Sequence, residues 1–282
     1  MKNLTDVFEL NNSVKIPCVG YGTWQTPDGD IAKEAVKEAL KIGYRHIDTA
    51  AAYGNEKSIG EAIKESGIKR EDLFVTSKLW NKCRGYETTI EAFNKTLEDL
   101  DLEYLDLYLI HWPANEKQFK NWKEINIDTW KAMVELYKEG KIKSIGVSNF
   151  RKHHLEPLLD FDVIPMVNQI EYHPGYMQSD LVEYCKSLGI LVEGWSPLGM
   201  GRVLENEVLV ETANKYSRSV AQICIRWAVQ KGILPLPKSV TPHRIEENAR
   251  VFDFEISDED ITKIDNMGSC GFSGLDPDEV EF

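Results

Sequence analysis

The chain has 282 residues, of which 42% are hydrophobic and 10% aromatic, a composition typical of a globular protein with a large core. Its 33 basic and 46 acidic residues give a net charge of −13 at pH 7, which argues against nucleic acid or an anionic membrane as a partner. No stretch approaches the roughly 20 apolar residues of a membrane span, and residues 1–12 lack the apolar segment of a secretory signal.

The first predicted element is a β-hairpin near the N-terminus. Residues 7–10 and 15–19 are largely apolar and flank the polar Asn11-Asn12-Ser13, a pattern typical of two strands joined by a turn. We expect this hairpin to lie over one end of the structure that follows.

After the hairpin, eight short apolar runs alternate with longer amphipathic stretches. The runs lack polar alternation, as strands buried on both faces do. The predicted strands are Val19–Tyr21, His46–Asp48, Leu73–Leu79, Tyr104–His111, Ile142–Val147, Met166–Ile170, Leu191–Trp195 and Ile233–Pro237. The predicted helices between them are Ile31–Ile42, Ser58–Lys64, Thr89–Leu100, Asp128–Glu139, His154–Leu159, Asp180–Leu188 and Ser219–Lys231. This alternation favours an α/β fold of the (β/α)8 TIM-barrel type over an open doubly wound sheet.

Two extra helices are predicted after the last strand. One begins at Thr241-Pro242, because threonine suits the N-cap and proline the first turn. The other begins at Ser257, and residues 268–282 form a short acidic tail. Because no linker or low-complexity segment interrupts the chain, we expect residues 1–282 to form a single domain.

Reactive residues come directly after many of the predicted strands. They are Asp48, Lys78, His111, Ser148, Asn149, Gln169, Trp195 and Ser196. Singly, a surface lysine or a core histidine is ordinary. A barrel, however, gathers the carboxyl ends of its strands around one mouth, where enzymes of this fold have their active sites. Tyr53, in the small-residue loop after Asp48, belongs to the same group.

Residues 236–248 are the candidate for phosphate binding. Lys238 and Ser239 precede a predicted helix, whose free N–H groups and positive dipole end attract an anion. Arg244 and Asn248 lie one turn apart on that helix, so both can reach one ligand. The alternative is a capped helix end with solvated charges.

Over nearly its whole length the chain resembles the aldo-keto reductases. Three stretches carry the resemblance: the loop from Asp48 to Tyr53, the strand Met166–Pro174 and the segment 236–248. The chain is most similar to short-tailed bacterial and protozoal members such as methylglyoxal reductases, 2,5-diketo-D-gluconate reductases and prostaglandin F synthases. The resemblance implies reduction of aldehydes and ketones to alcohols with NADPH (NADP+), on small carbonyls such as methylglyoxal and keto sugars.

The resemblance also implies a catalytic set of Asp48, Tyr53, Lys78 and His111. Tyr53 would give its proton to the carbonyl oxygen, and His111 would donate a hydrogen bond to the same oxygen. A free tyrosine has a pKa of about 10 and is a weak acid at neutral pH. We expect Lys78 to lower the pKa of Tyr53 modestly, with Asp48 keeping Lys78 charged and in place.

The same resemblance assigns residues to the cofactor and the substrate. The cofactor-binding residues would be Gly22, Thr23, Trp24, Asp48, Ser148, Asn149, Gln169, Trp195, Ser196, Leu198, Lys238, Ser239, Val240, Arg244, Glu247 and Asn248. Lys238 and Arg244 suit the 2′-phosphate of NADPH, the first as a point charge and the second as a planar fork. The substrate pocket would consist of Trp24, Tyr53, Trp80, His111 and Trp112.

Substrate specificity in this family depends on variable loops. The corresponding segments here are residues 113–127, residues 199–206 and the tail 268–282, and we expect the short tail to leave the site open. The expected partner is a small-molecule carbonyl substrate, with no metal, and the chain is expected to be a monomer.

Two alternatives stay open. A Schiff-base lyase would use Lys78 as its nucleophile, although Asp48 would keep that lysine protonated. A cofactor-binding barrel subunit without enzymatic activity would keep the phosphate segment. The five cysteines, which have no metal-binding or redox spacing, are interpreted as reduced thiols of a cytoplasmic protein.

Overall fold

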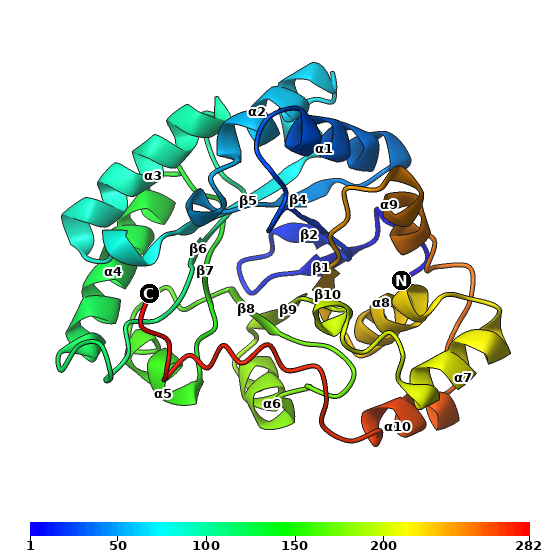
Figure 1. Cartoon of the computed structure of the whole chain (residues 1–282). Helices are drawn as coiled ribbons and strands as arrows, with labels where there is room; N and C mark the ends of the chain where they lie inside the picture. Colours follow the sequence, from blue (N-terminus) through cyan, green and yellow to red (C-terminus); the bar gives the residue numbers. More distant parts are fainter.

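A computed structural model describes all residues from Met1 to Phe282 (Figure 1). Eight parallel strands follow one another around a barrel in chain order, and helices surround them. The strands are β3 (Tyr21–Gly22), β4 (His46–Asp48), β5 (Phe74–Leu79), β6 (Leu107–Ile110), β7 (Ile145–Ser148), β8 (Val167–Glu171), β9 (Leu191–Trp195) and β10 (Leu234–Leu236). The predicted (β/α)8 barrel is confirmed, with every strand within a few residues of its expected place.

Backbone hydrogen bonds close the barrel between its first and last strands. The Gly20 N–H donates to the Pro235 carbonyl oxygen, and the Gly22 N–H donates to that of Pro237, both at 3.1 Å. Glycine at position 20 is what lets the chain approach so closely, because a Cβ there would lie 2.5 Å from the Leu236 side chain. The ring of strands is therefore continuous.

Ten α-helices lie outside the strands. They are α1 (Asp30–Ile42), α2 (Glu56–Glu65), α3 (Tyr86–Leu100), α4 (Trp122–Lys138), α5 (Lys152–Leu155), α6 (Ser179–Ser187), α7 (Glu207–Tyr216), α8 (Val220–Gln230), α9 (Pro242–Ala249) and α10 (Asp258–Asp265). Short 3₁₀ turns complete the connections: η1 (Ala51–Tyr53), η2 (Arg70–Asp72), η3 (Asn81–Cys83), η4 (Glu156–Leu158) and η5 (Gly199–Gly201).

The two extra helices are not the pair that the sequence predicts. The helix at Pro242, α9, follows the last strand and packs against α1 and α8, so it is the eighth helix of the barrel repeat. The extra helices are α10 and α7, which contact each other. α7 has no counterpart among the predicted helices, although Asn206 caps it by accepting hydrogen bonds from the Val208 and Leu209 N–H groups.

The fourth helix begins earlier than predicted. Residues 122–127, expected to belong to a variable loop, form the first turns of α4. Buried contacts explain the longer helix. The Trp122 ring packs against the edge of His154 at 5.2 Å between centroids, and the Asn126 amide exchanges two hydrogen bonds with the Ala114 backbone.

The predicted N-terminal hairpin is present. β1 (Val7–Glu9) pairs antiparallel with β2 (Lys15–Pro17). In the turn between them, Asn11 Nδ2 donates to the Pro165 carbonyl oxygen at 3.1 Å and Asn12 Nδ2 to that of Lys143 at 3.0 Å. Both acceptors precede barrel strands, so the hairpin covers the amino end of the barrel.

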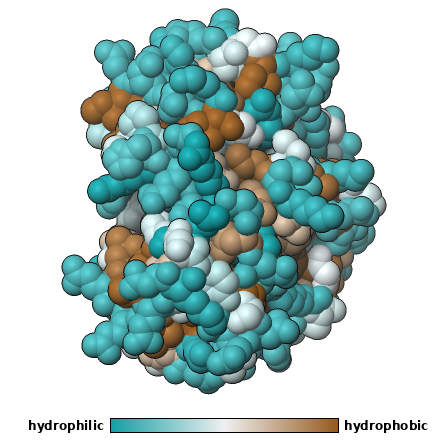
Figure 2. All heavy atoms as spheres, turned by 90° about the vertical axis from the view of Figure 1, so that its right-hand side faces the viewer, coloured by the Kyte–Doolittle hydropathy of each residue, from teal (hydrophilic) through white to brown (hydrophobic).

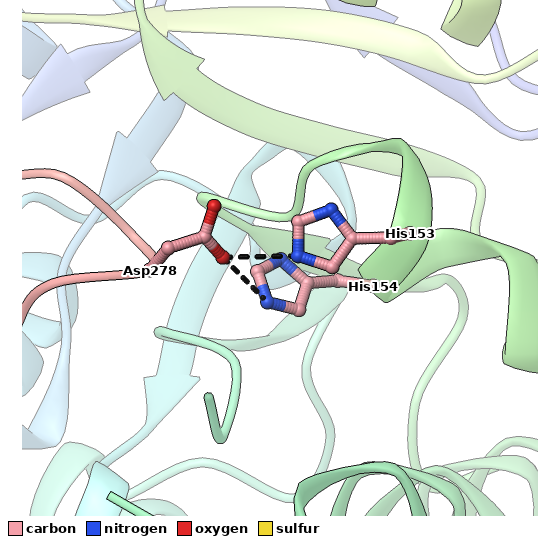
Figure 3. Close-up of side chains that lie close together, drawn as sticks. All are labelled: His153, His154 and Asp278. Atoms are coloured by element: carbon pink, nitrogen blue, oxygen red, sulfur yellow. Dashed lines mark hydrogen bonds and ion pairs between the residues drawn. The ribbon is translucent and has the colours of Figure 1, made fainter. Parts of the chain in front are cut away.

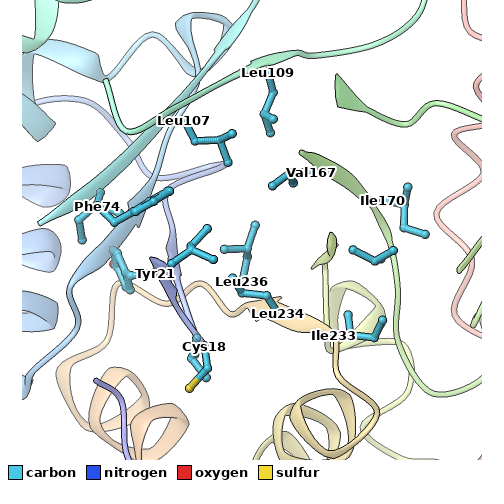
Figure 4. Packing of buried hydrophobic residues seen from close by; sticks show 14 of the residues in the cluster. Cys18, Tyr21, Phe74, Leu107, Leu109, Val167, Ile170, Ile233, Leu234 and Leu236 are labelled. Carbon is cyan, nitrogen blue, oxygen red and sulfur yellow. The ribbon is translucent and has the colours of Figure 1, made fainter. Parts of the chain in front are cut away.

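Apolar side chains fill the barrel interior. They belong to one cluster of 59 buried hydrophobic residues that extends out to the helices. Figure 4 shows Leu107, Leu109, Val167 and Leu236 of this cluster pointing inward from β6, β8 and β10. This packing occupies the middle of the barrel, and polar side chains meet beyond it, at the carboxyl ends of the strands.

The outer surface is mixed in character. On the face drawn in Figure 2, hydrophobic side chains form separate patches among hydrophilic ones. None of the helices combines the length and the apolar character needed to cross a membrane. All five cysteines are unpaired, in agreement with their interpretation as free thiols.

The cap of α7 gives a stability prediction. We expect Asn206→Ala to lower the free energy of unfolding by about 1 kcal/mol, because two helix N–H groups lose their acceptor. Thr241→Ala is the matched control, since the Thr241 side chain at the N-cap of α9 accepts no such hydrogen bond. Urea denaturation of both variants without added ligand measures the difference, and equal losses would contradict a capping role for Asn206.

Candidate active site

A cavity of about 510 Å³ opens at the carboxyl ends of the barrel strands. The predicted site residues in its wall are Gly22, Trp24, Asp48, Tyr53, Trp80, His111, Trp112, Ser148, Asn149, Gln169, Trp195, Ser196, Leu198 and Lys238. Residues far apart in the sequence therefore meet around one space, as expected for the mouth of a barrel.

The Lys78 ammonium lies behind this wall and joins two residues of it. Its side chain is 0% exposed and donates to Asp48 Oδ1 at 2.7 Å, to the Thr49 carbonyl oxygen at 2.9 Å and to Tyr53 Oη at 3.3 Å. Burial lowers the pKa of Lys78, but the Asp48 carboxylate and Tyr53 outweigh it and raise that pKa above its usual value. Lys78 is therefore charged at neutral pH.

The pKa of Tyr53 is raised, whereas the sequence predicts that Lys78 lowers it. Burial raises the pKa of Tyr53, and this effect exceeds the opposing attraction of the Lys78 ammonium, so the net shift is upward. The Asp48 carboxylate adds to the increase because it disfavours a nearby phenolate. The expected lowering of the Tyr53 pKa is therefore wrong for the free site, and Tyr53 is protonated at neutral pH.

His111 is neutral in this environment. Burial, together with the Lys78 charge, lowers the pKa of His111 well below its usual value. Its ring packs edge-on against Tyr53, with 5.6 Å between centroids, and against Trp80 at 5.4 Å. Its Nδ1 atom is buried without a hydrogen-bond partner. A neutral imidazole therefore stands in the wall next to the phenol.

A second set of buried polar groups continues the network across the barrel. Gln169 Nε2 donates to Asp48 Oδ2 at 2.9 Å and to Glu193 Oε2 at 2.7 Å. Glu193 is missing from the residues predicted from sequence, and it does not line the cavity itself. A glutamate inside an otherwise apolar predicted strand was the available signal, because such a residue has to find a polar partner.

The indole of Trp195 is held by a side chain from the neighbouring part of the wall. Trp195 Nε1 donates to Asn149 Oδ1 at 2.8 Å. The Asn149 amide nitrogen in turn donates to the His111 carbonyl oxygen at 3.0 Å and to Ser148 Oγ at 3.1 Å. Asn149 adopts a left-handed backbone conformation, with φ of 63°. Its amide therefore sets the plane of the Trp195 ring.

The predicted phosphate segment leads away from the cavity. Lys238 stands at the rim and donates to the Gln25 carbonyl oxygen at 2.9 Å. The residues beyond it, outside the cavity wall, are Ser239, Val240, Arg244, Glu247 and Asn248. Asn248 is buried, whereas Arg244 is exposed. No side chain caps the N-terminus of α9. Pro242 has no N–H, and the Arg244 N–H donates to the Thr241 carbonyl oxygen at 3.0 Å, so the His243 N–H is the donor of the first turn that is left for an anion.

Thr23, predicted to bind the cofactor, does not line the cavity. Its side chain is buried, and Oγ1 donates to the Asp48 carbonyl oxygen at 3.0 Å. Thr23 thus steadies the end of β4 without lining the cavity.

The C-terminal tail covers part of the cavity mouth. It crosses the barrel as an extended segment, drawn in red in Figure 1, and Leu275 and Phe282 line the cavity. The Phe282 ring stacks on Trp80 with an interplanar angle of 13° and meets Trp112 edge-on at 5.4 Å. The short tail therefore contributes to the cavity wall and covers only part of its mouth.

Three side chains near the tail could suggest a metal site. His153, His154 and Asp278 offer ligand atoms within 4.8 Å of one another (Figure 3). However, His154 Nδ1 accepts the Arg151 backbone N–H at 3.2 Å, so its Nε2 carries the ring proton and faces Asp278 Oδ1 at 3.2 Å. The Arg151 guanidinium also binds Asp278, at 2.6 Å. These contacts attach the tail to the start of α5.

Several wall residues were not predicted individually, although Leu236 and Pro237 begin the predicted phosphate segment 236–248. They are Gln25, Ala52, Pro197, Met200, Gly201, Leu236, Pro237, Leu275 and Phe282. Met200, Gly201, Leu275 and Phe282 belong to segments predicted to be variable loops, which was the only signal for them. The others are neighbours of predicted residues along the chain.

The comparisons with known proteins agree with this geometry. The model of the aldo/keto reductase family matches residues 18–268. A glyoxal reductase of Bacillus subtilis (strain 168) is 53% identical over 281 residues, which cover 99% of each chain. The crystal structure of MGS-M4, an aldo-keto reductase from a deep-sea metagenome library, is 44% identical, with a TM-score of 0.92 over 98% of this chain and 100% of that one. A Gox0644 variant solved in complex with NADPH is 42% identical, with a TM-score of 0.91 over 99% of each chain.

The buried ion pair gives a second stability prediction. We expect Lys78→Met to lower the free energy of unfolding by about 3–5 kcal/mol, because it leaves the Asp48 carboxylate buried without its cation. The double variant Lys78→Met/Asp48→Asn removes that charge and should recover a large part of the loss. Urea denaturation at pH 7 measures both, and a double variant no more stable than the single one would contradict the assignment.

Proposed function

Because the chain belongs to the aldo/keto reductase family, we propose that it reduces small aldehydes and ketones to alcohols, with NADPH as the hydride donor and Tyr53 as the general acid. One observation supports this most directly. A protonated phenol, a buried ammonium and a neutral imidazole lie together at one end of a cavity, and a carbonyl that becomes an alkoxide needs a proton and hydrogen-bond donors of this kind.

The residues present fit NADPH. Gly22 is in the cavity wall, where a Cβ would lie 3.3 Å from the Leu236 carbonyl oxygen. At the other end, the uncapped N-terminus of α9 offers the His243 N–H, and the exposed Arg244 offers a positive charge, to phosphates. The flat faces of an indole, here Trp195, suit stacking on a nicotinamide ring.

The cofactor would extend from the barrel mouth to α9. Ser148, Asn149 and Gln169 would hold the carboxamide group, and Ser196 and Leu198 would follow the pyrophosphate. The adenosine end, with its 2′-phosphate, would meet Lys238, Ser239, Val240, Arg244, Glu247 and Asn248. This assignment accounts for the buried polar groups on one side of the cavity and for the basic residues beyond its rim.

Each of the four central residues has a separate task in the reduction. Bound NADPH supplies a hydride for the carbonyl carbon. The Tyr53 hydroxyl proton moves to the carbonyl oxygen, and neutral His111 donates a hydrogen bond that orients this oxygen. The Lys78 ammonium stabilises the Tyr53 phenolate that remains, and Asp48 keeps that ammonium in place.

A raised pKa of Tyr53 is compatible with this role. It keeps the hydroxyl protonated at neutral pH, so the acid is present when the substrate binds. An alkoxide is a much stronger base than a phenolate, and the transfer therefore remains favourable. Without Lys78, burial and Asp48 would raise the pKa of Tyr53 further, so the lysine limits the penalty for forming the phenolate.

The cavity supports a small substrate. Its aromatic wall includes Trp24, Trp80, Trp112 and Phe282, which suits the apolar part of a short aldehyde or dicarbonyl. A relative that covers the whole chain carries the name glyoxal reductase. We therefore place methylglyoxal and similar small dicarbonyls before keto sugars as candidate substrates.

The two alternative functions have less support. A Schiff-base lyase needs a neutral amine, whereas the surroundings of Lys78 raise its pKa. A non-enzymatic cofactor-binding subunit has no need for the acid, the ammonium and the imidazole that meet next to free space. NADPH oxidation across a panel of aldehydes and ketones separates the readings, because tight NADPH binding without turnover of any carbonyl would favour the binding subunit.

We also propose that the protein is a single-domain, cytoplasmic monomer. One hydrophobic cluster extends from Leu10 to Ile264, which supports a single domain of residues 1–282. The five unpaired cysteines fit a reducing, cytoplasmic compartment. The site uses residues of one chain, so a monomer suffices for the proposed activity.

The role of Tyr53 leads to a kinetic prediction. Tyr53→Phe should lower kcat for methylglyoxal at least about a hundredfold, because the general acid is lost, while the Kd for NADPH stays within about twofold. Tyr137→Phe, in α4 outside the cavity, is the matched control and should keep full activity. Retained turnover with weakened NADPH binding would show that Tyr53 holds the cofactor and is not the acid.

The choice of cofactor depends on Arg244 in this proposal. Arg244→Ala should raise the KM for NADPH about tenfold or more and leave that for NADH nearly unchanged, since a charge-assisted contact to the 2′-phosphate is lost. Arg250→Ala, at the end of the same helix and paired with Glu246, serves as the control. Equal effects of Arg244→Ala on both cofactors would exclude the 2′-phosphate contact.

A further inference from the structure

Glu193 is a buried acid that the mechanism above leaves without a task. Its side chain is 0% exposed, and in the sheet it stands opposite Gln169 of β8. It comes two residues before Trp195, which lines the cavity, so the alternation of a strand directs both side chains to the barrel interior. Glu193 thus lies one layer below the cavity floor.

The Gln169 amide connects Glu193 to the central residues. Its nitrogen donates one hydrogen bond to Glu193 and one to Asp48, which uses both of its hydrogens. Asp48 in turn binds the Lys78 ammonium. A continuous network of hydrogen bonds therefore leads from Glu193 to the ammonium that contacts Tyr53.

These bonds determine which way the amide faces. With Nε2 turned toward two carboxyl groups, the carbonyl oxygen of Gln169 is the atom left for the cavity, whose wall includes this residue. An acceptor there selects a ligand group that presents an N–H. The reversed amide would place its oxygen against Oδ2 of the Asp48 carboxylate, which can only accept hydrogen bonds, a repulsive arrangement.

We propose that Glu193 is a positioning residue: it holds the Gln169 amide with its oxygen toward the cavity, ready to accept a hydrogen bond from the carboxamide of NADPH. This inference rests on the proposed function, because it concerns how that cofactor is held. Asp48 alone could bind only one of the two amide hydrogens in this geometry, so Glu193 supplies the second fixed point.

Glu193 performs this task as a neutral carboxylic acid near pH 7. Burial raises the pKa of Glu193 to about 8, and the Asp48 carboxylate adds to the increase, against weaker effects of Gln169 and Lys78. The neighbouring strand β10 contributes only apolar side chains there, Leu234 and Leu236 among them. Glu193 Oε1 is buried without a partner, which costs less for a neutral group than for a carboxylate.

The test compares two substitutions at this position. Glu193→Met removes the acceptor at similar length, and it should raise the Kd for NADPH about tenfold, as expected when one hydrogen bond to a buried amide is lost. Glu193→Gln keeps a neutral acceptor and should leave that Kd within about twofold. Binding is measured by the quenching of tryptophan fluorescence on addition of NADPH. If Glu193→Met does not fold, Glu193→Asp, which withdraws the carboxyl group by one methylene, replaces it.

A matched control and a double variant show whether Glu193 acts through Gln169. Glu56→Met changes another buried glutamate, whose pKa burial raises to about 7 and which binds Ser77 outside the cavity; it should not change NADPH binding. The loss from Glu193→Met should disappear in a Gln169→Leu background, because the amide it positions is then absent.

Three results would overturn the inference. They are unchanged NADPH binding by a folded Glu193→Met variant, equal weakening by Glu193→Gln, or additive losses in the double variant. Failure of the proposed function is a separate observation, made on the unaltered protein. If that protein binds NADPH but reduces no carbonyl, the proposed enzyme is wrong while the binding test of Glu193 still stands. If it does not bind NADPH, both are wrong.

Discussion

A fully buried ammonium group is the constraint on which the rest of the site depends. Removing the charge of Lys78 from water costs several kcal/mol, and the structure offsets this with a carboxylate, a backbone carbonyl and a phenol within 3.3 Å. All three partners come from β4 and the loop after it. Because β4 and β5 pair in register, the lysine and its partners are positioned by the barrel itself.

The same hydrogen-bond network joins the Lys78 ammonium to the Gln169 amide through a single residue, Asp48. Asp48 uses one carboxylate oxygen for Lys78 and the other for Gln169, so the ammonium beside the Tyr53 phenol and the Gln169 amide share one anchor. A shift of this carboxylate would disturb both at once. The buried Glu193 gives the Gln169 amide a second hydrogen-bond acceptor at 2.7 Å, at a position where an apolar residue would need no polar partner.

The order of strands and the residues at their carboxyl ends could be predicted, because both follow from apolar periodicity and from the geometry of parallel strands. The rise in the pKa of Tyr53 could not, since it depends on how deeply a loop side chain is buried relative to its neighbours. Glu193 was not predicted as a site residue for a related reason, because its hydrogen-bond partner Gln169 lies in the adjacent strand, 24 residues away. α7 was missed because its cap is an asparagine that also suits a loop.

The path of the tail has a consequence for how this scaffold diversifies. Several anchors of the tail hold its backbone: Asn115 binds the Pro277 and Val280 carbonyl oxygens at 2.9 Å, and Arg202 binds that of Phe272 at 2.9 Å. Contacts of this kind do not depend on which side chains the tail carries. Tail residues that line the cavity, such as Leu275, can therefore change in evolution or in the laboratory while these contacts remain, so new pocket shapes are accessible without rebuilding the barrel.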